Sequence, residues 1–200
     1  MNRFILGFFA LALATAPAVA NIPSPDLCVL EMDPYWAVLF TLPNGGGNAF
    51  TDARGEGGAV DATLTLTVVN SLGDPIYNYP GEDIWLETPS VDFVTCGLAN
   101  PDSNTDATGQ TRWADPLFGG GNSLGSGVQA VIAGGVVPVA AALQFVSADM
   151  NGDLQVNLSD ITTFTQALAV YDINADFNAD GVVNLSDITL MTQGIGASCP

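Results

Sequence analysis

The chain has 200 residues, of which 21 are Asp or Glu and three are Lys or Arg, so its net charge at pH 7 is −18. Nucleic-acid affinity depends largely on neutralising phosphates with Lys and Arg, so this composition excludes a nucleic-acid-binding protein. The sequence also contains no His and no Lys. Ser-His-Asp and Cys-His catalysis, His-ligated zinc and Lys Schiff bases are therefore excluded, and we expect a protein that is not an enzyme.

The N-terminus has the layout of a secretory signal peptide. Arg3 precedes an apolar run over residues 4–14, and Ala18-Val19-Ala20 offers a small-residue cleavage site before Asn21. The run is too short to span a membrane. We therefore expect residues 1–20 to be a signal peptide and the mature protein to be secreted, extracellular or at the cell surface, without membrane insertion.

Residues 21–146 are predicted to form a β domain. Residues 62–68 alternate apolar side chains with threonines, which is typical of a half-buried strand, and a cluster of turn residues follows at 70–75. Further short apolar runs lie at 84–87, 91–95, 128–132 and 136–145. Loops separate them, as do Gly-rich breaks at 119–121 and 134–135. This spacing predicts a mainly β fold with an antiparallel β-sandwich that has its own core.

The chain has three cysteines, Cys28, Cys96 and Cys199. In an oxidising compartment two of them can pair, and Cys28 with Cys96 is the expected bridge because both lie in the same predicted domain. Cys199, next to the C-terminus, would then stay free or crosslink to another chain.

A twelve-residue pattern occurs twice near the C-terminus, starting at Asp149 and again at Asp176. Each copy has oxygen-bearing side chains at positions 1, 3, 5 and 12, and position 7 can supply a main-chain carbonyl, which is the donor set that Ca²⁺ requires. The sequence Asn-Leu-Ser-Asp-Ile-Thr leaves both copies, at 157–162 and at 184–189. The duplication therefore predicts two Ca²⁺ sites, each followed by a helix.

An ordinary EF-hand also needs a helix that enters the loop. Residues 136–145 contain Pro138 and β-branched residues, and only the short segment 171–175 precedes the second loop. Neither stretch supports a long entering helix. A loop followed by a helix, twice within residues 147–196 of a secreted chain, resembles the dockerin type I family, whose calcium loops are EF-hand-like.

The resemblance implies the metal ligands. In the first loop these are Asp149, Asn151, Asp153, Gln155 through its carbonyl, Asn157 and Asp160, and in the second loop Asp176, Asn178, Asp180, Val182 through its carbonyl, Asn184 and Asp187. Asn157 and Asn184 occupy position 9, where a ligand often acts through water. The first loop departs from the pattern at position 6, where Leu154 replaces the glycine that the second loop has as Gly181. A leucine there must accept a strained backbone or shift the turn, so we expect the first site to be the weaker one.

The same resemblance implies a protein partner. In dockerin-like modules the residues just before the last ligand face a cohesin-type domain, and here they are Leu158, Ser159, Leu185 and Ser186. The identical pairs would present the same small patch twice, related by a pseudo-twofold axis.

A second resemblance concerns the β domain. Residues 62–76 and 105–113 are similar to invasin-like bacterial immunoglobulin-like domains, in which a strand ends in a D-x-x-G-x-P type turn and a later T-D-x-x-G turn opens another strand. The chain departs from this pattern with Asn70 in first place and Asp74 before the proline. The resemblance implies a non-catalytic surface or adhesive module.

Together these observations predict a signal peptide (1–20), an immunoglobulin-like β-sandwich (21–146) and a small helical dockerin-like module (147–200) that binds two Ca²⁺ ions and a cohesin-type partner. Two other functions stay open. Residues 21–146 could bind or degrade polysaccharide, with Trp36, Trp85 or Trp113 stacking on a carbohydrate ligand. Alternatively, the protein could be a calcium-stabilised surface adhesin whose C-terminal module packs on its own β domain and has no cohesin partner.

Overall fold

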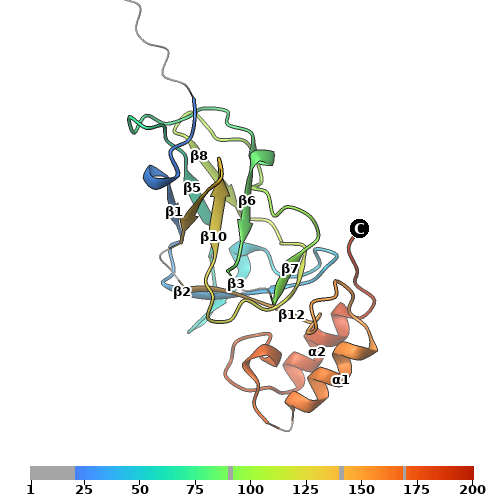
Figure 1. The fold of residues 1–200 in the computed structure, drawn as a ribbon. Coiled ribbons are helices and arrows are strands. Elements are labelled where there is room, and N and C mark those ends of the chain that lie inside the picture. The colour runs from blue at the N-terminus through green and yellow to red at the C-terminus, as the bar shows by residue number, and fades with distance from the viewer. Residues whose placement is uncertain (1–20, 90–91, 140–141, 169) are drawn as a thin grey trace, which may run out of the picture.

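A computed structural model describes residues 21–89, 92–139, 142–168 and 170–200 of the chain. The predicted signal peptide lies outside the described residues. Figure 1 shows the strands gathered in one β body, here called the sandwich (residues 21–146), with the two α-helices of the C-terminal module (residues 147–200) packed together at one end of it. Among the described residues no helix combines the length and the apolar character needed to cross a membrane.

The described chain contains strands, short 3₁₀ helices and two α-helices. The strands are β1 (Val29–Glu31), β2 (Trp36–Thr41), β3 (Ala53–Gly55), β4 (Gly58–Val60), β5 (Leu64–Thr67), β6 (Ile84–Glu87), β7 (Phe93–Thr95), β8 (Gln110–Trp113), β9 (Gly119–Gly121), β10 (Gln129–Ile132), β11 (Gly135–Pro138) and β12 (Ala142–Ser147). The 3₁₀ helices are η1 (Pro25–Leu27), η2 (Phe50–Asp52), η3 (Gly81–Asp83) and η4 (Ile173–Ala175), and the α-helices are α1 (Leu158–Ala167) and α2 (Leu185–Gly194).

The strands of the described chain form sheets with the orders β1-β5-β8, β11-β10-β6, β12-β2-β3-β4 and β7-β9. The mainly β class is confirmed, and the arrangement is consistent with a β-sandwich. The prediction that the sandwich is antiparallel is wrong for one pair, because β12 runs parallel to β2 from Ala142 opposite Trp36 to Ser147 opposite Thr41. A parallel pair needs a long connection between its strands, and nearly the whole sandwich lies between these two.

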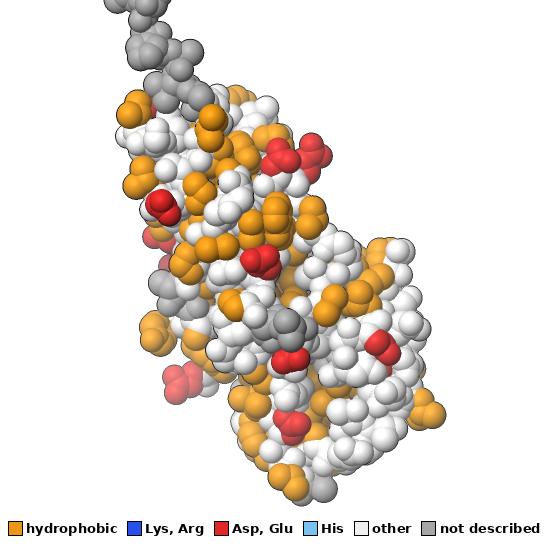
Figure 2. Space-filling model, in the orientation of Figure 1, with side chains coloured by type: hydrophobic (Ala, Val, Ile, Leu, Met, Phe, Trp, Pro, Cys, Tyr) orange, Lys and Arg blue, Asp and Glu red, His pale blue; other side chains and the backbone are white. Residues whose placement is uncertain are grey.

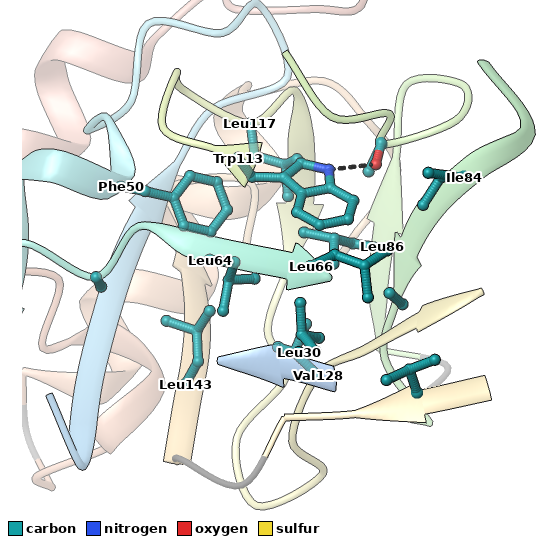
Figure 3. Packing of buried hydrophobic residues seen from close by; sticks show 14 of the residues in the cluster. Leu30, Phe50, Leu64, Leu66, Ile84, Leu86, Trp113, Leu117, Val128 and Leu143 are labelled. Carbon is teal, nitrogen blue, oxygen red and sulfur yellow. Dashed lines mark hydrogen bonds between the residues drawn. The ribbon is translucent and has the colours of Figure 1, made fainter. Parts of the chain in front are cut away.

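The main core lies between the sheets and is drawn in Figure 3. Leu64 and Leu66 of β5 are fully buried and pack in the same cluster as Phe50 and Trp113. The indole N–H of Trp113 donates a hydrogen bond to the carbonyl of Ala99 at 2.9 Å, so this large side chain is buried with its one donor satisfied. The alternation predicted for residues 62–68 is confirmed.

A second core joins the sandwich to the C-terminal module. Strand β2 is buried on both faces: Ala37 and Leu39 belong to the main core, whereas Val38 and Phe40 belong to the second. A strand that is buried on both faces has an unbroken apolar run in its sequence, as residues 36–40 do. The α-helices therefore pack against the outer face of the sheet that contains β2 and β12.

Phe177 lies at the centre of this second core. Its ring centroid is 5.4 Å from that of Phe40 on β2 and 5.5 Å from that of Phe164 on α1, and its side chain is fully buried. Phe177 thus connects the sandwich, the first helix and the second calcium-type loop, in which it follows Asp176.

The predicted Cys28–Cys96 disulfide is wrong. Cys96, just after β7, is bonded to Cys199, with 5.6 Å between their Cα atoms, and Cys28 is a free, buried thiol. Cys28 lies next to β1 in the main core, where burial raises the pKa of its thiol. Assigning the cysteines by domain failed because the C-terminus returns to the sandwich and brings Cys199 to Cys96.

We predict that Phe177→Ala destabilises the chain by about 3 to 5 kcal/mol, because it removes a fully buried ring between two elements and leaves a cavity. Ile173→Ala, at a half-exposed position of the same module, should cost well under half as much. Denaturant unfolding of the two variants and the wild type measures both values. Equal stability of the Phe177 variant and the wild type would contradict the shared core.

We predict that peptide mapping without reduction finds Cys96 linked to Cys199 and Cys28 as a free thiol. Because the bond closes a loop with a sequence separation of 103 residues, Cys199→Ser should destabilise the protein by roughly 4 kcal/mol on chain-entropy grounds. Recovery of a peptide that links Cys28 to either other cysteine would contradict this pairing.

Candidate calcium centres

The two α-helices begin in the same way because their first residues are the same. Asn157 is the N-cap of α1 and Asn184 the N-cap of α2, and each side-chain oxygen accepts a hydrogen bond from the main-chain N–H two residues later, at 2.8 Å. Asp160 and Asp187, three residues after the caps, accept hydrogen bonds from the main-chain N–H groups of those caps. Each exit segment is therefore a complete capping box, which fixes where the helix starts.

Within the described residues no long helix enters either loop, as the sequence predicts. Strand β12 runs almost directly into the first loop, and the short η4 precedes the second. Each unit is thus a loop followed by a helix, and strand β12 takes the place of an entering helix in the first unit.

Each loop folds around the carboxylate at its first position. Asp149 Oδ1 accepts hydrogen bonds from the N–H groups of Gly152 and Asp153 at 3.0 and 3.2 Å, and its Oδ2 accepts one from Leu154 at 2.8 Å. In the second loop, Asp176 accepts from the equivalent Asp180 and Gly181 at 3.1 and 2.8 Å. The two loops therefore share one main-chain geometry.

Further hydrogen bonds connect the predicted ligand positions of the first loop. Asn151 Oδ1 accepts from Asp153 N at 2.9 Å, and the Asn151 N–H donates to Asp160 Oδ1 at 3.3 Å. The side-chain amide of Asn157 donates to the carbonyl of Gln155 at 3.4 Å. Positions 3, 5, 7, 9 and 12 thus lie around one loop.

The second loop repeats these contacts. Asn178 Oδ1 accepts from Asp180 N at 3.0 Å, and the Asn178 N–H donates to Asp187 Oδ1 at 3.4 Å. The side-chain amide of Asn184 donates to the carbonyl of Val182 at 3.2 Å. The structure therefore brings all twelve predicted ligand residues together, six in each loop.

Four of the carboxylates are buried: Asp149 and Asp176 at the starts of the loops, and Asp160 and Asp187 at their ends. Burial, followed by the negative charges of Asp160 and Asp153, raises the pKa of Asp149 to about 6, although main-chain N–H groups act in the opposite direction. Burial, with the charge of Asp176 adding to it, also raises the pKa of Asp187. Asp149 and Asp187 are thus buried beside other carboxylates, which is a costly arrangement.

Figure 2 shows acidic side chains spread over the visible face, with no Lys or Arg among them. Arg54 of β3 lies near the second loop, where it lines a hollow together with Asn178 and Asp180.

The donor atoms of both loops fit Ca²⁺ by type, because all are carboxylate, amide or main-chain carbonyl oxygens and none is nitrogen or sulfur. Over the residues that the structure describes, no three His, Cys, Asp or Glu side chains gather closely enough to form a metal-binding group on their own. The donor set of each loop therefore depends on Asn side chains and carbonyls as well as carboxylates.

The backbone at position 6 is left-handed in both loops, with φ of 65° at Leu154 and 86° at Gly181. Position 4 is also left-handed in both, with φ of 70° at Gly152 and 54° at Ala179. Each loop thus has one glycine and one other residue in this region, at exchanged positions. Leu154 does take the strained conformation, but Ala179 places a comparable strain in the second loop, so Leu154 alone gives no reason to rank the sites.

The predicted partner-binding residues lie on the surface. Leu158 and Leu185, the first residues of α1 and α2, are 74 % and 77 % exposed, and Ser159 and Ser186 beside them are exposed as well. The fold gives these two leucines no buried role, although other apolar residues of the same module are packed in the second core.

Two contacts of the loops are not evident in the sequence. The Tyr171 hydroxyl donates to Asp176 Oδ2 at 3.2 Å, where the only available signal was an aromatic residue five positions before the loop. The glycines at 119–121, interpreted from the sequence as a break, form β9, and the Gly121 N–H donates to the carbonyl of Asp149 at 2.7 Å.

Comparison with known proteins gives no family. No protein-family model matches the chain, and no curated protein matches it. Among solved structures, the chain is similar to one in a crystal structure of an N-terminal interface mutant of a type II cohesin–X-dockerin complex from Acetivibrio cellulolyticus, at 16 % identity and a TM-score of 0.28, covering 85 % of this chain and 97 % of that one. A TM-score this low carries no argument, so a function can be inferred only from the geometry of the chain itself.

We predict that Gly181→Ala destabilises the module by about 1 kcal/mol, because a side chain at a φ of 86° is disfavoured even though no atom lies within 4 Å of the added Cβ. Gly57→Ala is the matched control, since its Cβ also meets no atom within 4 Å and its φ is not left-handed. Thermal unfolding compares the two variants, and equal stability would contradict the assigned loop conformation.

Proposed function

We propose that this chain is a secreted, non-catalytic calcium-binding protein, made of an immunoglobulin-like β-sandwich and a dockerin-like module that docks onto a cohesin-type partner on a scaffold or cell surface. One observation carries the proposal. Two identical exit segments start two helices on buried aspartates and leave the same Leu-Ser pair exposed at each start. Folding alone requires the aspartates and the caps, but it does not require an exposed leucine at both positions.

In this proposal each loop holds one Ca²⁺ ion. The ligands are the side chains at positions 1, 3, 5 and 12 and the carbonyls of Gln155 and Val182. Asn157 and Asn184 already cap the helices with their side-chain oxygens, so they would contribute through water. The ion would supply positive charge beside the buried aspartates at the start and end of each loop, and it would couple the formation of the loop to the start of the helix behind it.

The partner surface is small and mixed in character. Each copy offers a branched apolar side chain beside a hydroxyl, and a protein interface commonly obtains most of its affinity from a few such apolar anchors that become desolvated. Because the two copies have the same local geometry, a half-turn of the module about the pseudo-twofold would present an equivalent surface. Two binding orientations are therefore expected.

The experiment is titration calorimetry against a cohesin-type domain in excess Ca²⁺. We predict that Leu158→Asp with Ser159→Lys leaves affinity nearly intact, because the other copy substitutes, and that Leu185→Asp with Ser186→Lys does the same. All four changes together should abolish binding, since charge would enter the interface in both orientations. Leu98→Asp, at a position on the sandwich that is also largely exposed, is the control and should bind normally.

If one pair of changes alone abolishes binding, only that copy forms the interface and the two-orientation proposal is wrong. If the quadruple variant binds like the wild type, the Leu-Ser pairs are not the docking surface at all.

A calcium-stabilised adhesin without a cohesin partner is the second candidate, and the packing favours it. The C-terminal module shares a core with the sandwich through Phe177 and is tied to it by the Cys96–Cys199 bond. In that case no cohesin-type domain would bind, while Ca²⁺ would still stabilise the whole chain. The polysaccharide alternative has less support, because Trp113 is buried in the main core and Trp36 and Trp85 are only partly exposed.

A further inference from the structure

The first loop rests directly on the sandwich. The carbonyl of Asp149 accepts a hydrogen bond from Gly121 N of β9 at 2.7 Å, and the Asp149 N–H donates to Ser147 Oγ at 3.2 Å. The Ser147 hydroxyl in turn donates to the carbonyl of Thr41, the last residue of β2, at 2.8 Å. The main chain of the first ligand is thus held from both sides by strands of the sandwich.

The side chain of Asp149 lies against Gly120. A Cβ added to Gly120 would overlap Asp149 Oδ2 and would lie 2.7 Å from Asp149 Cγ. Both groups are buried, so neither has open space to move into. Gly120 has no left-handed backbone, so the absence of a side chain, and not backbone freedom, is what the position requires.

Strand β9 is itself fixed by the β7 segment. Gly119, Gly120 and Gly121 pair with Thr95, Val94 and Phe93 in an antiparallel ladder. Directly after β7 comes Cys96, whose disulfide to Cys199 holds the far end of the C-terminal module. The support under the first loop and the anchor of the C-terminus therefore belong to one ribbon.

The second loop lies differently. The main-chain N–H of Asp176 donates to the carbonyl of Ile173 at 3.3 Å, and the carbonyl of Asp176 accepts from Ala179 N at 3.3 Å, so both main-chain partners belong to the C-terminal module. Two loops with nearly the same sequence thus differ in what holds the main chain of the first ligand: in one it is the sandwich, in the other it is the module.

We infer that Gly120 positions the first calcium ligand, Asp149, and that Ca²⁺ at the first site stabilises the β7–β9 ribbon of the sandwich whereas Ca²⁺ at the second site does not. The inference rests on the proposed calcium binding and adds to it a division of roles between the two sites. A side chain at Gly120 displaces the Asp149 carboxylate, and so it removes the first site while the second stays intact.

Calcium titration of the secreted, disulfide-intact chain after chelator treatment tests the positioning role. The wild type and the control Gly57→Ala should bind two ions. Gly120→Ala should bind one ion at unchanged affinity and the other at least tenfold more weakly, and Gly120→Ala combined with Asp176→Ala should bind none tightly. Retention of the second site in Gly120→Ala reports that this variant is folded.

Hydrogen exchange of residues 92–122 with and without Ca²⁺ tests the coupling to the sandwich without depending on Gly120→Ala. Calcium should slow exchange there in the wild type and in Asp176→Ala, but not in Asp149→Ala. Two tight ions in Gly120→Ala, or calcium-dependent protection that survives in Asp149→Ala, would overturn this inference alone. A wild-type chain that binds no Ca²⁺ would overturn the proposed calcium binding together with it.

Discussion

The burial of four aspartates in two short loops is the constraint on which the C-terminal module of this protein depends. Hydrogen bonds from main-chain N–H groups satisfy the oxygens of Asp149, Asp160, Asp176 and Asp187, but hydrogen bonds from neutral groups do not remove the charge. The negative charges of neighbouring aspartates make the burial of Asp149 and Asp187 less favourable still. A divalent cation in each loop would compensate the charge of the buried carboxylates and reduce the repulsion between them. It would also coordinate the carboxylate oxygens through their remaining lone pairs.

The same aspartates decide where the helices begin, and the helices decide what the module can bury. Asp160 and Asp187 close the capping boxes of α1 and α2, so the helix starts and the last proposed metal ligands are the same residues. Phe164 on α1 stacks on Phe177 of the second loop, and Phe177 packs against Phe40 on the outer face of β2. A module of this size could bury little apolar surface alone, and sharing a core with the sandwich supplies what it lacks. The exposed helix starts are left accessible to a partner.

Local sequence features predicted the local structure well. The alternation at 62–68, the identical helix starts at 157 and 184, and the absence of long entering helices all depend on neighbours in sequence, and all agree with the described structure. The parallel pairing of β2 with β12, the Cys96–Cys199 bond and the position of Phe177 could not be predicted, because each depends on contacts between segments far apart in the chain. The glycines at 119–121 show the limit most clearly. Their sequence fits a break, and only contacts with distant segments show why side chains are absent: Phe93 lies against Gly119 and Asp149 against Gly120.

Calcium occupancy of the two loops is tested most directly by a crystal structure of residues 21–200 from crystals grown in Ca²⁺, with anomalous scattering used to locate the ions. We predict one ion in each loop, at about 2.3 to 2.6 Å from the carboxylates of Asp149 and Asp160 in the first and of Asp176 and Asp187 in the second. An electron-density map from crystals grown in excess Ca²⁺ that shows no ion in either loop, while the four aspartates remain buried, would contradict the proposed calcium binding.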